Sequence, residues 1–389
     1  MTHHFGPHFL QIPGPSAIPD RVLRAISMPI IDHRGPEFAE LAQTVLGGIR
    51  RIFGTEHPVL IFPGSGTGAW ESAVVNTLSE GDRVLMVETG HFASQWRRLT
   101  EKWGVVTDFI PGDWRNWADP EAIHEKLTAD THHQIKAVMV VHNETSTGVA
   151  SPIKAIREAI DDASHPALLM VDAISSLGSL PYEHDAWRVD VAVTCSQKGL
   201  MLPPGLAFVA LSSRAIEQSK SGGMRRSYWD WSEMIEFNRT GFFPYTPATN
   251  LLYGLRESIA MIEEEGMTNV FARHDRLAAA TRAAVQAWGL EVLCANEQAH
   301  SSVLTAVMMP DGHDADALRH YVLENFNLAL GQGLSHLKGK IFRIGHLGQC
   351  NELVLLATLS GIEMGLSGLG IPHQRGGVHA AMDILKRRA

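Results

Sequence analysis

Cysteine is scarce in this chain of 389 residues, which contains only Cys195, Cys294 and Cys350, far apart in the sequence. They form no CxxC or other zinc-type spacing, and three cysteines cannot all pair within one chain. This usage is typical of a reducing compartment. The sequence therefore predicts a cytoplasmic protein without a disulfide framework and without a metal site.

Long apolar runs and an excess of basic residues are also missing. The longest apolar runs, such as Ala137–Val141, have the length of a strand, far short of the ~20 residues that a membrane helix needs. Residues 1–11 lack the charged and apolar regions of a signal peptide. Lys and Arg number 33 against 42 Asp and Glu, which gives a net charge of −9. We therefore expect neither membrane association nor nucleic-acid binding.

What the sequence does contain is an alternation of short apolar runs with longer helical patterns. An apolar run of strand length that is followed by a helical pattern predicts a largely parallel sheet with helices on both faces. The predicted strands are Val59–Phe62, Arg83–Val87, Ala137–Val141, Ala167–Val171, Val189–Val193 and Leu206–Leu211. The fold class is thus α/β, and ligands are expected at the carboxyl ends of the strands.

The pattern changes after about Pro247. Long amphipathic helices are predicted over 251–265 and 270–288, followed by short strands and a helix over 352–366. We predict a large domain over residues 17–250 and a smaller α+β domain over residues 251–389, completed by the N-terminal segment 1–16.

Polar residues follow several of the predicted strands. Gly64–Gly68 reads Gly-Ser-Gly-Thr-Gly and opens a helix, so its backbone N–H groups can bind a phosphate, although the pattern equally fits a tight turn that binds nothing. Asp172 ends a very apolar strand, where it either meets a cation or caps a turn. Lys198 lies among small and apolar residues, where burial would lower its pKa as a Schiff-base lysine requires; taken singly, it could be a surface lysine.

The three features together are more specific than any one of them. A phosphate loop, an Asp that pairs with a pyridinium nitrogen and a Lys that binds an aldehyde are what pyridoxal 5'-phosphate requires. The sequence thus predicts this cofactor, with Lys198 and Asp172 as the catalytic residues.

Asp190–Lys198, followed by Gly205–Phe208, resembles the lysine motif of the class V pyridoxal-phosphate aminotransferases. The resemblance extends along nearly the whole chain. The sequence resembles the serine–glyoxylate and alanine–glyoxylate aminotransferases, and it resembles the bacterial serine–glyoxylate and aspartate–glyoxylate branch most. Further segments that carry it are Ile12–Ser16, Gly64–Glu71, His142–Gly148, Val171–Asp172, Gly241–Pro247, Leu252–Arg256 and Phe342–Gly348. The resemblance implies fold type I of the pyridoxal-phosphate enzymes.

The resemblance also implies roles for individual residues around the cofactor. Ser65, Gly66 and Thr67 match the phosphate-binding turn, and Gln197 matches a further contact on the phosphate side. Phe92 matches the position of the aromatic ring that stacks on the cofactor, where alanine–glyoxylate members have Trp. A further position, Thr145, matches a hydroxyl near the phenolic oxygen of the cofactor.

Three more positions concern the substrate and a second subunit. Arg343 matches the arginine that binds the substrate carboxylate, a task that suits a guanidinium group; alone, it could pair with a buried acid. Tyr245 and Thr246 match residues that reach the phosphate of the partner subunit. The family's tyrosine falls nearer Phe243, which makes Thr246 the firmer match. A homodimer with shared active sites is therefore expected.

The implied reaction moves the amino group of a small L-amino acid, serine first, to glyoxylate. Aspartate and alanine stay open as donors, because the sequence does not describe the shape of the side-chain pocket. A cysteine-desulfurase-like lyase is an alternative, with Cys350 as its nucleophile. A cofactor-binding regulatory module is another, although no DNA-binding module precedes the fold. Sulfide release from cysteine and DNA retention, respectively, would identify these alternatives.

Overall fold

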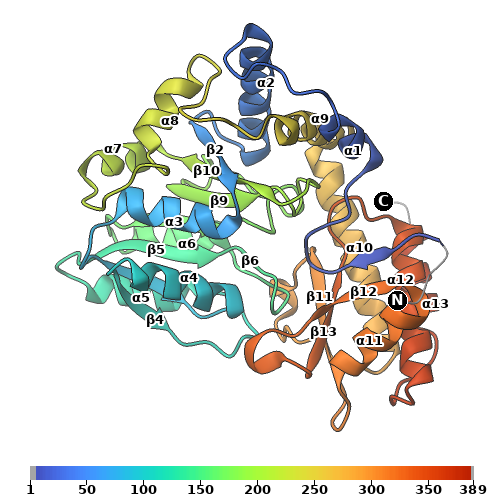
Figure 1. Ribbon diagram of the computed structural model, residues 1–389. Coiled ribbons are helices and arrows are strands. Elements are labelled where there is room, and N and C mark those ends of the chain that lie inside the picture. Colours follow the sequence, from blue (N-terminus) through green and yellow to red (C-terminus); the bar gives the residue numbers. More distant parts are fainter. Residues whose placement is uncertain (1–5, 387–389) are drawn as a thin grey trace.

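The structure, a computed structural model that describes residues 6–386, contains two main sheets (Figure 1). In the larger sheet, β10 runs antiparallel to both of its neighbours, while the remaining pairs are parallel. The prediction of a largely parallel sheet is therefore confirmed. Its seven strands, in spatial order, are β2 (Val59–Gly64), β10 (Gly205–Leu211), β9 (Val191–Cys195), β8 (Leu168–Asp172), β5 (Ile135–Val141), β3 (Arg83–Val87) and β4 (Val106–Ile110).

The central strands are buried along their whole length. Every residue of β8 and β9 is buried, which explains why these strands read as continuous apolar runs and not as alternating ones. Helices pack around this sheet (Figure 1). They are α2 (Pro36–Phe53), α3 (Gly66–Thr77), α4 (His91–Lys102), α5 (Pro120–Ala129), α6 (Ile153–Asp162), α7 (Ser213–Ser221) and α8 (Trp231–Asn238).

The smaller sheet combines the start of the chain with its last third. Its strands follow the order β1 (Phe9–Gln11), β12 (Leu328–Gln332), β13 (Ile341–Gly345) and β11 (Leu304–Met308). The blue strand β1 lies among the orange and red elements in Figure 1 and pairs in parallel with β12. This sheet packs with α11 (Ala315–Phe326) and α12 (Glu352–Gly368), and α13 (Gly377–Leu385) packs on α12.

Two helices connect the two parts. Helix α9 (Thr249–Glu265) packs against α1 (Asp20–Ile26) and α2, and its side chains Leu252 and Ile259 belong to the core of the large sheet. Helix α10 (Met267–Ala287) begins in that core with Val270 and continues into the core of the small sheet with Leu277. The domain division at residue 250 stays a prediction.

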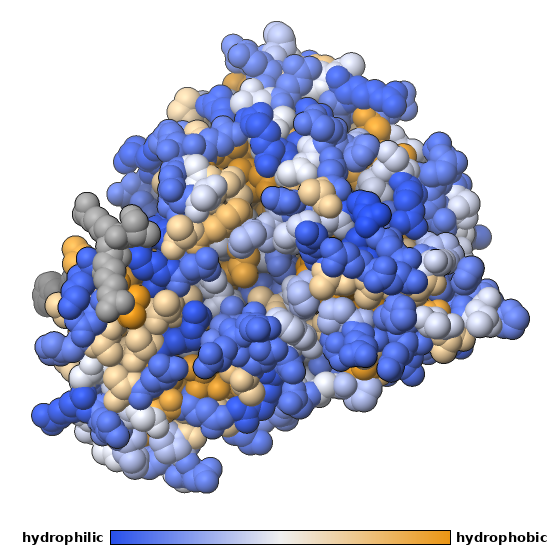
Figure 2. Space-filling view, turned by 180° about the vertical axis from the view of Figure 1, so that it is seen from behind, coloured by the Kyte–Doolittle hydropathy of each residue, from blue (hydrophilic) through white to orange (hydrophobic). Residues whose placement is uncertain are grey.

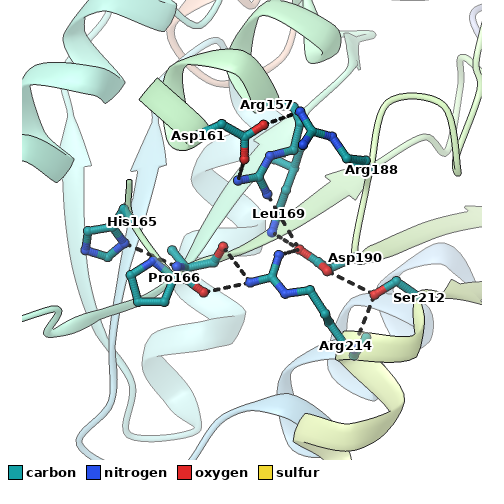
Figure 3. A network of polar contacts seen from close by, with 11 residues as sticks. Arg157, Asp161, His165, Pro166, Leu169, Arg188, Asp190, Ser212 and Arg214 are labelled. Carbon is teal, nitrogen blue, oxygen red and sulfur yellow. Dashed lines mark hydrogen bonds and ion pairs between the residues drawn. The ribbon is translucent and has the colours of Figure 1, made fainter. Parts of the chain in front are cut away.

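A buried ion network stands at the edge of the large sheet that carries the amino ends of its parallel strands (Figure 3). Asp190, directly before β9, accepts hydrogen bonds from the backbone N–H of Leu169, from Ser212 and from Arg214. The guanidinium of Arg157 lies between Asp190 and Asp161. A buried charge needs a partner, so we interpret this network as one that stabilises the fold. It lies on the edge of the sheet opposite Asp172 and Lys198.

The face shown in Figure 2 is mainly hydrophilic, with patches of hydrophobic residues between the hydrophilic ones. Among residues 6–386, no helix combines the length and the apolar character that crossing a bilayer requires.

Candidate active site

A cavity of about 180 Å³ opens at the carboxyl ends of the central strands. It brings together all the residues predicted for the cofactor within one subunit, from the ends of five strands. The residues that line it are Ser65, Gly66, Thr67, Trp70, Phe92, Val141, Asn143, Thr145, Asp172, Ile174, Ser175, Cys195, Gln197 and Lys198. These positions are up to 133 residues apart in the sequence, from 65 to 198, and only the parallel strand arrangement makes them neighbours.

The glycine-rich turn forms the amino end of α3 at this cavity. Ser65 has extended backbone angles (φ −106°, ψ 170°), and the helix begins at Gly66, inside the glycine-rich segment. A side chain at Gly66 would lie 2.6 Å from Ile174 Cδ1, and one at Gly68 would lie 2.7 Å from the Trp229 ring. Glycine is therefore needed here, and the exposed Ser65 and Thr67 stand beside the unpaired N–H groups of the first turn.

Asp172 is the last residue of β8, and its side chain is 3% exposed. One oxygen, Oδ1, accepts the backbone N–H of Ile174 at 2.7 Å, and the other, Oδ2, accepts the indole N–H of Trp70 at 3.0 Å. Burial raises the pKa of this carboxyl from its ordinary value to about 7. A cationic partner in the cavity would offset the cost of burying the carboxylate charge.

Lys198 lies just beyond the end of β9. Its amine donates a hydrogen bond to the carbonyl oxygen of Pro13 at 2.6 Å, and its own carbonyl accepts the hydroxyl of Ser16 at 2.9 Å. A side chain on Gly14 would collide with the Lys198 amine. Burial lowers the pKa of the Lys198 ammonium, which favours the neutral, nucleophilic amine.

Phe92 is the second residue of α4, and its position depends on a buried carboxylate. Glu144 Oε2 accepts the backbone N–H groups of Phe92 at 3.1 Å and of Ala93 at 3.0 Å, while Oε1 accepts the hydroxyl of Ser146 at 2.6 Å. Glu144 thus caps α4 from another part of the chain and orients the ring that faces the cavity. Sequence reasoning did not assign this role, because the two segments are distant in sequence.

Arg343 stands beside the cavity, on the central part of β13 in the small sheet. Its Nε donates to the carbonyl of Gln332 at 2.7 Å and its Nη1 to the carbonyl of Thr145 at 2.5 Å. Burial lowers the pKa of the guanidinium to about 10, while Glu144 opposes this shift. No hydrogen bond within residues 6–386 occupies Nη2, so the group is fixed by two carbonyls and keeps donors for an anion.

The remaining predicted residues lie in two settings. Gln197 lines the cavity, and its buried Oε1 has no hydrogen-bond partner among residues 6–386. Tyr245 and Thr246 do not line it: the Tyr245 ring stacks on Tyr228 at 4.5 Å, and Thr246 is exposed. Within one subunit these two side chains are therefore separate from Lys198.

The residues present fit pyridoxal phosphate. The turn at Ser65–Thr67 offers donors to a phosphate, the buried carboxylate of Asp172 suits a protonated ring nitrogen, and the amine of Lys198 suits an aldehyde. Among residues 6–386, the buried amide oxygen Oε1 of Gln197, which lines the same cavity, has no hydrogen-bond partner.

Comparison with known proteins agrees with this geometry. The family model for class V aminotransferases matches residues 8–343. The chain belongs to the class V aminotransferases. Among its relatives is the serine–glyoxylate aminotransferase of Methylorubrum extorquens, 46% identical over 99% of this chain and 98% of the relative. The L-aspartate–glyoxylate aminotransferase of Paracoccus denitrificans is 42% identical over 96% of this chain and 94% of the relative.

Solved structures of the family share the whole architecture. Ureidoglycine–glyoxylate aminotransferase from Bacillus subtilis superposes with a TM-score of 0.91 at 28% identity and covers 100% of both chains. The chain is accordingly a transaminase of fold type I, which confirms the predicted enzyme class and fold.

The structure gives no support to the lyase alternative. Cys350 is buried, burial raises the pKa of its thiol to about 12, and it does not line the Lys198 cavity. A nucleophilic cysteine needs an accessible, easily ionised thiol. The likeness to a cysteine desulfurase from Thermococcus onnurineus, at 16% identity, concerns the fold alone.

Proposed function

We propose that this aminotransferase transfers the amino group of a small L-amino acid to glyoxylate, giving glycine and a 2-oxo acid. Serine is the proposed donor, and its product is hydroxypyruvate; aspartate, giving oxaloacetate, and alanine are the alternatives. The names of the relatives support glyoxylate as acceptor and both serine and aspartate as donors. One observation carries the proposal. Lys198, Asp172 and the amino end of α3 line one cavity, and Arg343 lies beside it, where it donates to the carbonyl of Thr145.

The chain's own residues then have defined tasks. The first turn of α3 holds the phosphate, and Phe92 covers the ring. Asp172 would hold a proton at the ring nitrogen of bound pyridoxal phosphate. Lys198, with its lowered pKa, would take the proton from the substrate Cα and deliver it two atoms away, at the carbon derived from the cofactor aldehyde. Bound pyridoxal phosphate supplies the conjugated ring that accepts the electron pair.

A half-reaction screen tests the donor. Each amino acid is added to the yellow holoenzyme without an acceptor, and the absorption spectrum is followed as the bound cofactor becomes pyridoxamine phosphate. Serine is expected to react fastest, and glyoxylate is expected to restore the original spectrum. A spectrum that changes with none of the amino acids, or is restored by other oxo acids but not by glyoxylate, contradicts the proposal.

Arg343→Ala is expected to raise KM for both the amino donor and glyoxylate, because both present a carboxylate to the same guanidinium. Losing a buried charge-assisted pair typically costs about 2–5 kcal/mol. Arg343→Lys is expected to restore binding only in part, since an ammonium group cannot form two parallel hydrogen bonds. The measurement is kcat/KM for each substrate in the wild type and both variants.

Arg83→Ala is the matched control, because Arg83 is an exposed arginine at the amino end of β3 that bonds Asp108 and does not line the cavity. Its kcat/KM values are expected to stay near those of the wild type. If glyoxylate efficiency survives Arg343→Ala while that of one donor falls, Arg343 recognises a donor side chain, and aspartate becomes the better donor candidate.

We propose further that the enzyme is a cytoplasmic homodimer with shared active sites. A second cavity, of about 580 Å³, adjoins the first and shares Thr67, Trp70 and Phe92 with it. It leaves the phosphate side of the site accessible from outside the subunit. The exposed Thr246 is available to fill such a space on another subunit. All three cysteines are free, in agreement with a reducing compartment.

Mixed dimers of Lys198→Ala with Thr246→Asp test the sharing. Each variant alone is expected to be nearly inactive, the second because a carboxylate repels the phosphate. If Thr246 serves the partner's site, one site of each mixed dimer is intact, and an equal mixture recovers about a quarter of wild-type activity. Sedimentation checks the dimer, and a Lys198→Ala mixture with Lys198→Arg is the control. No recovery in verified mixed dimers contradicts sharing.

A further inference from the structure

A tryptophan to which the sequence analysis gave no role contacts the catalytic carboxylate. Trp70, in the second turn of α3, is 4% exposed, and its indole Nε1 donates to Asp172 Oδ2 at 3.0 Å. The other carboxylate oxygen accepts the backbone N–H of Ile174 at 2.7 Å. Two donors from different directions therefore fix both the plane and the tilt of the Asp172 carboxylate.

The electrostatic consequence of this contact is specific. Burial penalises the charged form of Asp172, whereas the indole N–H and the backbone N–H of Ile174 favour it. A donor to a carboxylate stabilises the anion more than the neutral acid, because the anion is the stronger acceptor. The indole group thus counteracts, on one oxygen atom, the desolvation that pushes the proton toward Asp172.

A second tryptophan provides an internal comparison. The Trp96 ring stacks on the Trp70 ring with centroids 5.9 Å apart and 12° between the planes. Trp96 is fully buried, but its indole Nε1 has no hydrogen-bond partner within residues 6–386. The two rings share one packing environment and differ in whether the N–H reaches the carboxylate.

We propose that Trp70 is a positioning residue that orients Asp172 and keeps it ionised against the ring nitrogen of the cofactor. Without the indole donor, the shared proton moves from the ring nitrogen toward the carboxylate, and the ring becomes a weaker acceptor of electrons. The kinetic part of this inference rests on the proposed transamination, whereas the position of the proton does not.

The test compares Trp70→Phe with Trp96→Phe in the holoenzyme. Both variants lose the indole N–H and the same ring volume from one stack. Each is loaded with pyridoxal phosphate labelled at the ring nitrogen, and nitrogen NMR measures how far that atom is protonated. Trp70→Phe is expected to shift the signal toward that of the neutral pyridine, whereas Trp96→Phe is expected to leave it at the wild-type position.

A kinetic measurement accompanies the spectra. In single turnovers with the reactive donor, Trp70→Phe is expected to slow cofactor conversion by about tenfold, in line with the loss of one hydrogen bond to a charged group, with little change in donor binding. Trp96→Phe is expected to stay within about twofold of the wild type. Thermal unfolding of both variants measures the cost of altered packing, which is expected to be similar.

Two results would overturn the inference: an unchanged nitrogen signal in Trp70→Phe, or equal shifts in the two variants, which would indicate a packing effect. If Trp70→Phe yields no soluble protein, Trp70→Met, whose unbranched side chain adapts to gaps and has no donor, takes its place. Wild-type enzyme that reacts with no amino acid would refute the proposed function. The nitrogen signals would still decide the role of Trp70.

Discussion

Lys198→Ala is expected to abolish multiple turnover. The variant loses both the amine that binds the cofactor covalently and the base that moves the substrate proton, and proton transfer by a positioned side chain alone contributes about 10²–10⁴-fold. The amine lies just beyond the end of β9, and burial lowers its pKa. Among residues 6–386, no other lysine lines this cavity, so no neighbouring amine replaces it. Steady-state assays with donor and glyoxylate measure the loss.

Borohydride reduction locates the bond independently of activity. In the wild type, mass spectrometry of the digested, reduced protein is expected to find the cofactor on the peptide that contains Lys198, and Lys198→Ala is expected to show no such adduct. Lys136→Ala, an exposed lysine of β5, is the control and is expected to behave as the wild type. An adduct on any other lysine of the wild-type chain contradicts the assignment.

Asp172→Asn is expected to retain the cofactor but to slow proton transfer by about 10²–10⁴-fold. An amide keeps the shape of the side chain but not its charge, so it cannot hold a proton at the ring nitrogen. The buried position and the raised pKa of about 7 show how strongly this carboxylate depends on a cationic partner. Single-turnover absorption measurements with the best donor separate this step from binding.

The companion control for this variant is Asp190→Asn, which alters a carboxylate on the opposite edge of the same sheet. It is expected to lower the stability of the fold through the Arg157 network while the folded fraction keeps its rate per site. A near-wild-type rate for Asp172→Asn would show that Asp172 is only a turn residue, the alternative that its sequence position also allowed.

Much of this site could be predicted before the fold, because its chemistry lies in short segments. A strand end followed by a glycine-rich turn, by an Asp or by a Lys is a local pattern, and parallel strands bring such ends to one edge. Ser65, Asp172 and Lys198 could therefore be predicted as a group, and the structure places all three at one cavity.

Other features required the tertiary structure. Trp70 read as an apolar residue of α3, since nothing in a linear pattern shows where an indole N–H points. Glu144 lies in the family-like segment His142–Gly148, yet its role as the cap of α4 depends on a contact across 52 residues. Packing also decided that α9 contributes Leu252 and Ile259 to the core of the large sheet.

The sequence alone thus determined the class of chemistry, because an amine, a carboxylate and a phosphate-binding turn are encoded by residue type and local backbone. Only the tertiary structure decided how that chemistry is tuned. Burial of Asp172 and Lys198 moves their pKa values toward each other, and it arises from strands, helices and the Pro13 segment that meet from distant parts of the chain. Desolvation and hydrogen-bond geometry depend on these tertiary contacts, which a local sequence pattern does not reveal.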